Sequence, residues 1–311
     1  MDLVKGHTCT NEEAAALAQQ LQDHPDYRVI RRLVPRTQFA PPAGNPLSKG
    51  VIVDNETTGL SHENDKIIEI GLVSFEFDPQ TGKVYRVLES YGSLEDPGIP
   101  ILPEITEVTG ITSNMVAGQH IDDERVAQLV EGAALVIAHN AKFDRPFLEQ
   151  RLPIFESLQW GCSFAQIAWK DEGLGSAKLD YIAYQCGFFF DAHRAESDCM
   201  ALLEILQHPL PKSNIVALKR LIEQSDQKDW CVFALNSKFE TKDTLKARAY
   251  QWDAAKRCWH RTVTGSDAIK EEVSWLKETI YGGRQVTLEF ESRNALVKYS
   301  RRPGKQVTKT V

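Results

Sequence analysis

The feature that most constrains this chain is an apolar run that leads directly into acidic residues. Val51–Val53 is followed by Asp54 and, two positions later, by Glu56. Side chains at positions i and i+2 of a strand point to the same face, so both carboxylates reach one point. Buried carboxylates are costly unless a partner compensates their charge, and a divalent cation is such a partner. The segment therefore predicts a buried strand that ends at an acidic, cation-binding point.

Two further segments place acids where they can reach the same point. Asp144 follows the apolar run 134–138 and stands at the start of a helical pattern. His193 and Asp198 are five residues apart, so we expect His193 just before a helix and Asp198 about one turn inside it. Four carboxylates and one imidazole are what a pair of magnesium or manganese ions and a general base require.

The residues between these segments alternate between strand and helix patterns. Runs rich in β-branched and aromatic residues predict strands, and apolar periodicity predicts helices. An antiparallel meander is expected first, then helices around one buried strand, which together make an α/β domain with a mixed sheet. The expected strands are 51–53, 66–77, 85–90 and 134–138, and the expected helices are 122–131, 147–151, 163–170, 177–186 and 195–207.

Two breaks divide the chain into three parts. Pro41–Pro46 interrupts regular structure and marks a linker, which leaves residues 1–49 as an N-terminal arm and linker. Pro209 and Pro211 end a domain over 50–211, and residues 212–311 are expected to form a small α+β module. In that module we expect strands at 230–235 and 285–291, helices at 241–249 and 266–281, a hairpin over 250–260, and frayed residues from Ser300 onward.

Charge is divided unequally between the two halves of the chain. Residues 1–211 carry 16 Lys and Arg against 31 Asp and Glu, a net −15, whereas residues 212–311 carry 20 against 12, a net +8. A basic module is an electrostatic contact for phosphates, although a charge excess is also typical of an ordinary solvated face. The candidate nucleic-acid contacts are Lys242, Lys246, Arg248 and Arg257, interleaved with Trp252 and Trp259, which we expect to be core residues.

No segment predicts a membrane protein. The chain has no apolar run of about 18 residues and no signal-type start, and its six cysteines show no metal-ligand spacing. We therefore expect a cytoplasmic protein.

The three acidic segments together resemble the motifs of a known family. Asp54–Leu60, His139–Asp144 and His193–Asp198 are similar, in that order, to the three motifs of the DEDDh, or DnaQ-like, 3′→5′ exonucleases, and most of all to the epsilon-subunit type of DNA polymerase III. The resemblance covers about residues 50–207. It implies an RNase H-like fold for this part of the chain.

The resemblance also implies a role for each residue of the motifs. Asp54 would bridge two divalent cations, Mg²⁺ or Mn²⁺; Glu56 and Asp198 would complete the first and Asp144 would hold the second. His193 would take a proton from the attacking water. The expected substrate-binding residues are Thr57, Thr58, Gly59, Leu60, Val108, Ile111 and Phe143, with core packing as the alternative for the four large side chains, whereas His139 and Asn140 are expected to fix their loop by hydrogen bonds.

The implied activity is stepwise hydrolysis of DNA from its 3′ end, with release of nucleoside 5′-monophosphates from single strands or duplex ends. Two alternatives are an exonuclease that trims RNA ends and a catalytically silent interaction module on a nuclease fold. A polymerase or a sliding clamp is a candidate further partner. Gln207–Pro211 faintly resembles clamp-binding peptides, but a helix end followed by a linker is the preferred interpretation of this segment.

Overall fold

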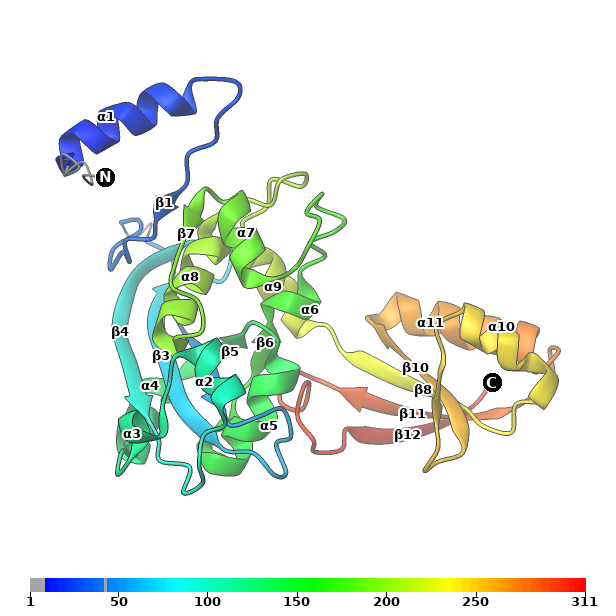
Figure 1. Cartoon of the computed structure of the whole chain (residues 1–311). Coiled ribbons are helices and arrows are strands. Elements are labelled where there is room, and N and C mark those ends of the chain that lie inside the picture. The colour runs from blue at the N-terminus through cyan, green and yellow to red at the C-terminus, as the bar shows by residue number, and fades with distance from the viewer. Residues whose placement is uncertain (1–8, 42–43) are drawn as a thin grey trace, which may run out of the picture.

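The computed structural model describes residues 9–41 and 44–311, and its strands form two five-stranded sheets (Figure 1) and one two-stranded sheet. Pro42 and Ala43 of the expected linker lie outside the described residues, as do residues 1–8 of the arm. Among the helices of the described residues, none is long and apolar enough to cross a membrane.

The first sheet is mixed and has the strand order β4-β3-β2-β5-β6. β2, β3 and β4 are antiparallel neighbours, and β5 and β6 extend the sheet in parallel on the other side of β2. This confirms the expected α/β fold with an antiparallel meander and helical crossovers, which is the RNase H-like arrangement. The strands are β2 (Ser48–Thr57), β3 (Ile67–Phe77), β4 (Val84–Leu94), β5 (Ala133–Ala138) and β6 (Trp160–Cys162).

Alternation along β2 divides the core between the two faces of this sheet. Ile52 packs with the helices of one face, and its neighbours Val51 and Val53 pack with the helices of the other. The first face is covered by α7 (Leu179–Gln185), α8 (Ala195–Gln207) and α9 (Ala217–Asp226). The second is covered by α4 (Asp123–Val130) and α5 (Ala141–Arg151).

Short elements complete this part of the chain. A small satellite cluster under α2 and α3 contains Ile68, Ile101, Ile111 and Val116. The elements are α2 (Pro103–Thr109), α3 (Ser113–Val116), α6 (Ser163–Gln166), β7 (Phe188–Phe189) and one 3₁₀ turn (Pro153–Ser157).

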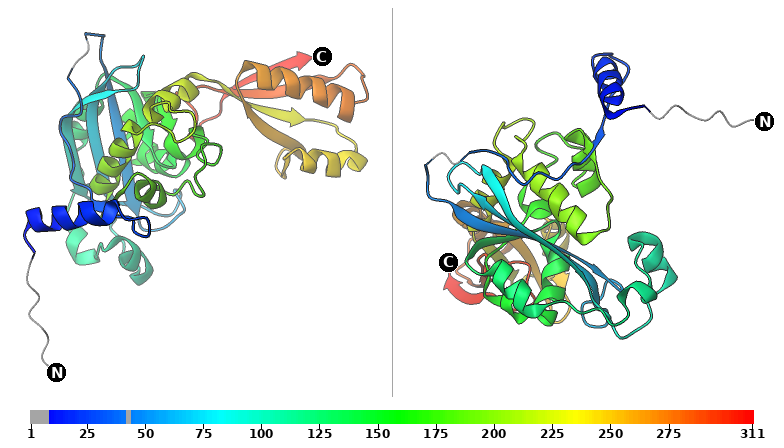
Figure 2. Two further views of the ribbon diagram at one scale, coloured as in Figure 1. Left: turned by 90° about the horizontal axis from the view of Figure 1, so that it is seen from above. Right: turned by 90° about the vertical axis from the view of Figure 1, so that its left-hand side faces the viewer.

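The N-terminal arm runs along the outside of the first domain (Figure 2). Its helix α1 (Asn11–Gln22) is closed by a capping box between Thr10 and Glu13 and buries none of its residues. The following strand β1 (Arg31–Arg32) pairs in parallel with β7. The arm therefore joins the domain through its extended part and not through its helix.

The second sheet has the strand order β12-β11-β8-β10-β9 and belongs to the C-terminal module. Apolar side chains of its central strands pack against two helices (Figure 1). The elements are β8 (Asp229–Ala234), a 3₁₀ turn (Phe239–Thr241), α10 (Lys242–Ala247), β9 (Gln251–Asp253), β10 (Cys258–Thr264), α11 (Ser266–Trp275), a π turn (Leu276–Ile280), β11 (Thr287–Arg293) and β12 (Lys305–Thr310).

The C-terminal residues correct one expectation. Residues after Ser300 were expected to fray, but β12 pairs with β11 over six positions and forms an edge of the sheet. The polar sequence of β12 is compatible with this position because an edge strand faces solvent and is held by backbone hydrogen bonds.

The junction between the two parts lies later than the sequence indicates. Helix α9 follows the expected boundary at residue 211, yet Leu218 and Leu221 are buried in the core of the first domain. We therefore propose that the exonuclease-type domain extends through α9 and that the module begins with β8.

Candidate active site

The three acidic segments meet at the carboxyl end of β2. Asp54 and Glu56 are on β2, and Asp198 lies in the first turn of α8. The ligand oxygens of these three residues all lie within 4.8 Å of one another. Asp144 is buried near the start of α5, and its charge acts on the carboxyl of Asp54. The structure thus brings together all four carboxylates that the sequence singles out.

Burial and mutual repulsion make these carboxylates hard to ionise without a compensating charge. Burial raises the pKa of Asp54 well above its usual range, and the charges of Asp144 and Asp198 add to that effect. Burial likewise raises the pKa of Glu56 to about 7, with Asp198 as the next cause. Burial also raises the pKa of Asp198 to about 7, and it raises the pKa of Asp144.

A divalent cation fits this group of side chains. Carboxylate oxygens are the hard ligands that Mg²⁺ and Mn²⁺ prefer, and a cation would offset the repulsion that raises these pKa values. Within the described part of the chain, Arg194 is the side chain whose positive charge opposes this repulsion, and it lowers the pKa of Glu56. One arginine does not match four acids. The donor set is therefore compatible with metal binding.

His193 lies in the loop before α8, as expected. Its side chain is exposed, and its backbone takes a left-handed φ of 63°. The backbone N–H groups of His193 and Arg194 donate to the carboxylate of Asp198 and oppose the rise in its pKa, the Arg194 bond being 3.1 Å long. These hydrogen bonds hold the His193 loop and the Asp198 side chain in place relative to each other.

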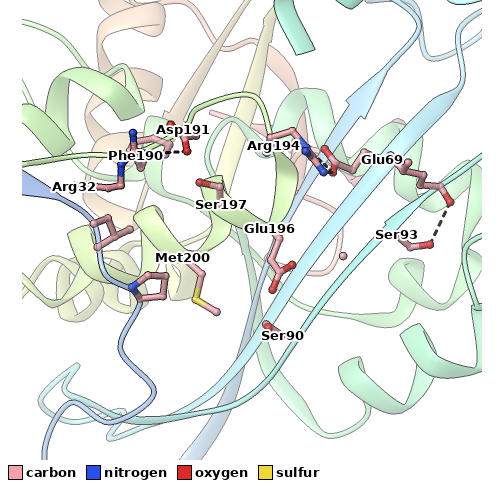
Figure 3. Close-up of a pocket in the computed structure, with 14 residues that line it drawn as sticks. Arg32, Glu69, Ser90, Ser93, Phe190, Asp191, Arg194, Glu196, Ser197 and Met200 are labelled. Atoms are coloured by element: carbon pink, nitrogen blue, oxygen red, sulfur yellow. Dashed lines mark hydrogen bonds and ion pairs between the residues drawn. The ribbon is translucent and has the colours of Figure 1, made fainter. Parts of the chain in front are cut away.

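The sequence analysis missed two residues that hold this loop. Glu69, on β3 directly opposite Glu56, is nearly fully buried. Its carboxylate accepts from Arg194 Nε at 3.0 Å (Figure 3). It also accepts from the backbone N–H of Ala195 at 3.1 Å. Glu69 and Arg194 both line a cavity of about 630 Å³ between α8, β4 and the arm. An acid inside the otherwise apolar run 67–73 was the available signal, since such a residue requires a partner.

A glycine allows α8 to approach the sheet this closely. A Cβ atom added to Gly71 on β3 would lie 2.3 Å from the backbone carbon of Ala195. Any side chain there would move the start of α8, which carries Asp198.

The loop after β2 is ordered by its own side chains. The hydroxyl of Thr57 donates to the carbonyl of Gly59 at 2.6 Å, and that of Thr58 donates to Asp65 at 3.2 Å. Both threonine side chains are buried, whereas Leu60 at the tip is 87% exposed. Leu60 is therefore accessible to a ligand, and the threonines shape the loop.

The remaining candidate substrate contacts differ in accessibility. Val108 on α2 is 56% exposed, and Phe143 is half-buried against Phe147. The expectation that Ile111 binds substrate is wrong. Its side chain is fully buried in the satellite cluster, so it cannot contact a nucleotide in this structure.

His139 fixes the second acidic segment by hydrogen bonds, as expected, whereas the side chain of Asn140 does not cap α5. The imidazole of His139 hydrogen-bonds to Ser163 Oγ and to the carbonyl of Ala177, each at 2.8 Å. Burial lowers the pKa of His139 to about 4, so the ring is neutral. Asn140 adopts a left-handed φ of 90° immediately before α5.

The candidate contacts of the module are less free than its charge suggests. The expectation that Arg248 contacts nucleic acid is wrong. Its guanidinium pairs with the buried carboxylate of Glu272 at 3.0 Å and stacks on Trp275 at 4.5 Å. Lys242 and Lys246 lie over Phe239 and Trp259, at 4.1 and 5.8 Å from the ring centroids. Arg257 is exposed in the turn between β9 and β10.

The two tryptophans of the hairpin are not both core residues. Trp252 is 52% exposed, so its expected burial is wrong, whereas Trp259 is half-buried beside the module core. Their rings meet edge to face with centroids 5.6 Å apart. The pair lies at the sheet edge, where β9 is the outermost strand.

The segment compared with clamp-binding peptides is packed into the domain. Gln207 accepts from the backbone N–H of Val84 at 2.8 Å, and Leu210 is buried. This corrects the clamp-peptide interpretation, because a binding peptide must expose such side chains.

Comparison with known proteins agrees with this geometry. Residues 51–206 match the model of the RNase T family, which is described as an exonuclease family. DNA polymerase III PolC-type of Clostridium perfringens is 34% identical over 208 residues, which are 63% of this chain and 13% of that protein. DNA polymerase III subunit epsilon of Treponema pallidum is 33% identical over 162 residues, which are 49% of this chain and 72% of that protein. The chain thus spans only a small part of the PolC-type relative.

A solved structure is also similar over part of the chain. Exonuclease X in complex with 5′ overhanging duplex DNA has 25% identity and a TM-score of 0.39, and it covers 55% of this chain and 99% of its own. The family match spans half of the chain and contains Asp54, Glu56, Asp144, His193 and Asp198. The protein therefore belongs to the RNase T family of exonucleases and is a nuclease.

Proposed function

We propose that this protein is a 3′→5′ exonuclease that hydrolyses DNA from its 3′ end and releases nucleoside 5′-monophosphates. The observation that carries the proposal is the group of Asp54, Glu56 and Asp198, whose ligand oxygens lie within 4.8 Å of one another beside buried Asp144. Phosphodiester hydrolysis at such a centre requires little else besides a general base and a bound strand end.

The roles divide among the residues of the centre. Asp54, Glu56, Asp144 and Asp198 would hold two divalent cations, Mg²⁺ or Mn²⁺. Cations bound there supply positive charge that stabilises the attacking and leaving oxygens of the phosphodiester. His193 accepts the proton of the attacking water, because an exposed imidazole is the side chain best suited to exchange protons near neutral pH.

Other residues position the proton acceptor and the strand end. Arg194, held by Glu69, keeps the His193 loop against α8. The backbone of Thr57, Thr58 and Gly59 and the exposed side chain of Leu60 receive the terminal nucleotide, and Val108 and Phe143 flank it.

DNA is the proposed substrate because the two relatives compared above are named as DNA polymerase III components. By the same argument, a DNA polymerase is the protein partner that we propose. An exonuclease that trims RNA ends is the alternative, and a direct comparison of DNA and RNA substrates separates the two.

A digestion panel tests the proposal. Single-stranded DNA, DNA duplexes with recessed 3′ ends and single-stranded RNA, each labelled at the 5′ end, are incubated with Mg²⁺, with Mn²⁺ or with EDTA. We expect a ladder that shortens one nucleotide at a time on DNA, requires the cation, and yields 5′-monophosphates. Immediate release of the 5′ label would contradict the direction, faster digestion of RNA would contradict the substrate, and no hydrolysis at all would support the silent-module hypothesis.

A further inference from the structure

The segment between β11 and β12 ties the module to the first domain. Arg145 on α5 is fully buried and donates to three backbone carbonyls of this segment: Ala295 at 3.2 Å, and Leu296 and Lys298 at 2.6 Å each. The carbonyl of Ala295 also accepts from the backbone N–H of Trp160 at 2.9 Å. The connection is therefore a set of buried hydrogen bonds, not a flexible linker.

A second group of buried charges reinforces the junction. Glu149 accepts from Arg145, from Ser300 at 2.5 Å and from Arg302 at 3.0 Å. Lys298, with a side chain that is 1% exposed, pairs with Asp229 of β8 at 3.3 Å. Breaking such buried pairs leaves a charge without compensation, so the two parts are held in one arrangement.

This junction encloses a cavity of about 550 Å³ with an unusual charge. Its lining includes four cationic side chains, Lys142, Arg293, Lys298 and Arg301, and one acid, Asp229. The cavity beside Glu69 has the opposite balance, with two arginines against three acids. In a chain of net charge −7, a cationic groove is a specific feature.

Two of the four cations are available to a ligand. Lys298 is committed to Asp229, and Arg293 to Glu291 at 2.7 Å. Lys142 is exposed, and it takes part in none of the ion pairs of the described residues. Arg301 is 67% exposed, with Glu63 at 3.8 Å, a pair too exposed to hold it firmly.

The groove shares helix α5 with the proposed active site. Lys142 stands two residues before Asp144 and is exposed at the groove, whereas Asp144 is buried. His62, which also lines the groove, follows the loop of Gly59 and Leu60 and meets Phe147 edge to face with ring centroids 6.4 Å apart. A strand whose 3′ end lies at the carboxylates has this groove as an adjacent cationic path.

We propose that the junction groove binds the phosphate backbone of the substrate strand behind its terminal nucleotide, with Lys142 and Arg301 as the phosphate contacts. The inference rests on the proposed function. Because buried hydrogen bonds hold the groove in place, binding there requires little ordering of the protein. The module would thus bind substrate at its junction with the first domain and not on its helical face.

Binding measurements on the full chain test this proposal. Fluorescence anisotropy of single-stranded DNA of increasing length is recorded in Ca²⁺ at several salt concentrations for the wild type and for Lys142→Ala/Arg301→Ala. Removing one cation that neutralises a phosphate should lower the slope of log affinity against log salt by about 0.7, so the double variant should show a decrease of about 1.4. The loss of affinity should be larger for long strands than for dinucleotides, which are too short to extend from the active site into the groove.

The matched control is Lys242→Ala/Lys246→Ala, which removes the same charge from α10. Weaker binding of long strands by the groove variant, with a smaller or no effect of the control, supports the proposal. A wild-type slope in the groove variant, or an equal decrease in the control, overturns it. The wild type hydrolyses DNA in either case if the proposed function is right, so the two failures are distinguishable.

Discussion

The first domain and the module differ in how far their buried carboxylates are compensated by cationic side chains. In the first domain, Asp54, Glu56, Asp144 and Asp198 are gathered without a matching number of cationic side chains in the described part of the chain, and their pKa values rise. In the module, the buried acid Glu272 is surrounded by its partners: Arg248 at 3.0 Å, Arg261 at 2.8 Å and the hydroxyl of Tyr250 at 2.8 Å. The four acids of the first domain therefore lack a full set of compensating charges among the described residues, whereas Glu272 has its hydrogen-bonding and ionic partners within the module.

This contrast shows how far net charge indicates function. The module has an excess of eight positive charges, yet several of its arginines neutralise acids of the same module. The excess therefore overstates the number of free cations on its surface. In the first domain the described residues leave one group of acids without full compensation, and that group is the candidate active site.

The strongest effect that we expect is the loss of activity on removal of a central carboxylate. Asp54→Asn or Asp198→Asn should lower the rate of hydrolysis by roughly 10³-fold or more, because each removes a cation ligand. Thermal melting in EDTA should show equal or higher stability, since repulsion is relieved. A variant that kept a tenth of the wild-type rate would exclude its residue from the centre.

The second effect concerns the proton acceptor. His193→Ala should lower kcat by roughly 10²- to 10⁴-fold and leave the affinity for DNA in Ca²⁺ unchanged. A kcat for the variant equal to that of the wild type would remove His193 from this role.

The third effect is on the stability of the module. Glu272→Ala leaves Arg248 and Arg261 without their carboxylate, and because both arginines are partly exposed we expect a loss of about 2–3 kcal/mol, below that of a fully buried pair. Urea unfolding measures this change. The neighbouring Glu271, which also pairs with Arg248 but is 77% exposed, is the control, and Glu271→Ala should cost about 0–0.5 kcal/mol. Equal losses in both variants would contradict the comparison.

A smaller effect is expected at the residue that holds the His193 loop. Arg194→Ala should reduce kcat by about tenfold with a smaller change in KM, and Arg194→Lys should recover part of the loss. Arg36 forms an ion pair of similar length, 2.6 Å, between the arm and Glu204 on α8, so Arg36→Ala is the control and should leave kcat unchanged. A kcat for Arg194→Ala equal to that of the control would show that Arg194 has no positioning role.

The weakest effect is a pH dependence of stability in the absence of cations. The folded-state pKa values of Glu56 and Asp198 are raised to about 7, so the folded protein binds protons more tightly than the unfolded chain. Their contribution is present at low pH and is lost as the pH rises from the ordinary carboxylate range through 7. Melting temperatures in EDTA should therefore fall across this window, and Mn²⁺ should restore stability most above pH 7. A melting temperature that rises over the same window would be the opposite of this expectation.

The sequence predicted the candidate site better than its surroundings. Helix 195–207 has the expected bounds because hydrophobic periodicity is a local signal. Asp54, Glu56 and Asp198 lie together as their resemblance to the three motifs implied. Strand 305–310 was missed because its stability comes from pairing with β11, which a polar edge sequence does not reveal. Likewise Ile111 and Arg248 have partners far along the chain, the satellite cluster and Glu272, which residue type alone cannot specify.

A titration with Mn²⁺ decides whether the uncompensated acids form a cation site while the compensated acid does not. Metal-free wild type, Asp54→Asn and Glu272→Gln are titrated, and bound Mn²⁺ is measured by electron paramagnetic resonance. We expect Mn²⁺ binding by the wild type and by Glu272→Gln, and its loss in Asp54→Asn. Equal binding by Asp54→Asn and the wild type would contradict the assignment of these acids as a cation site.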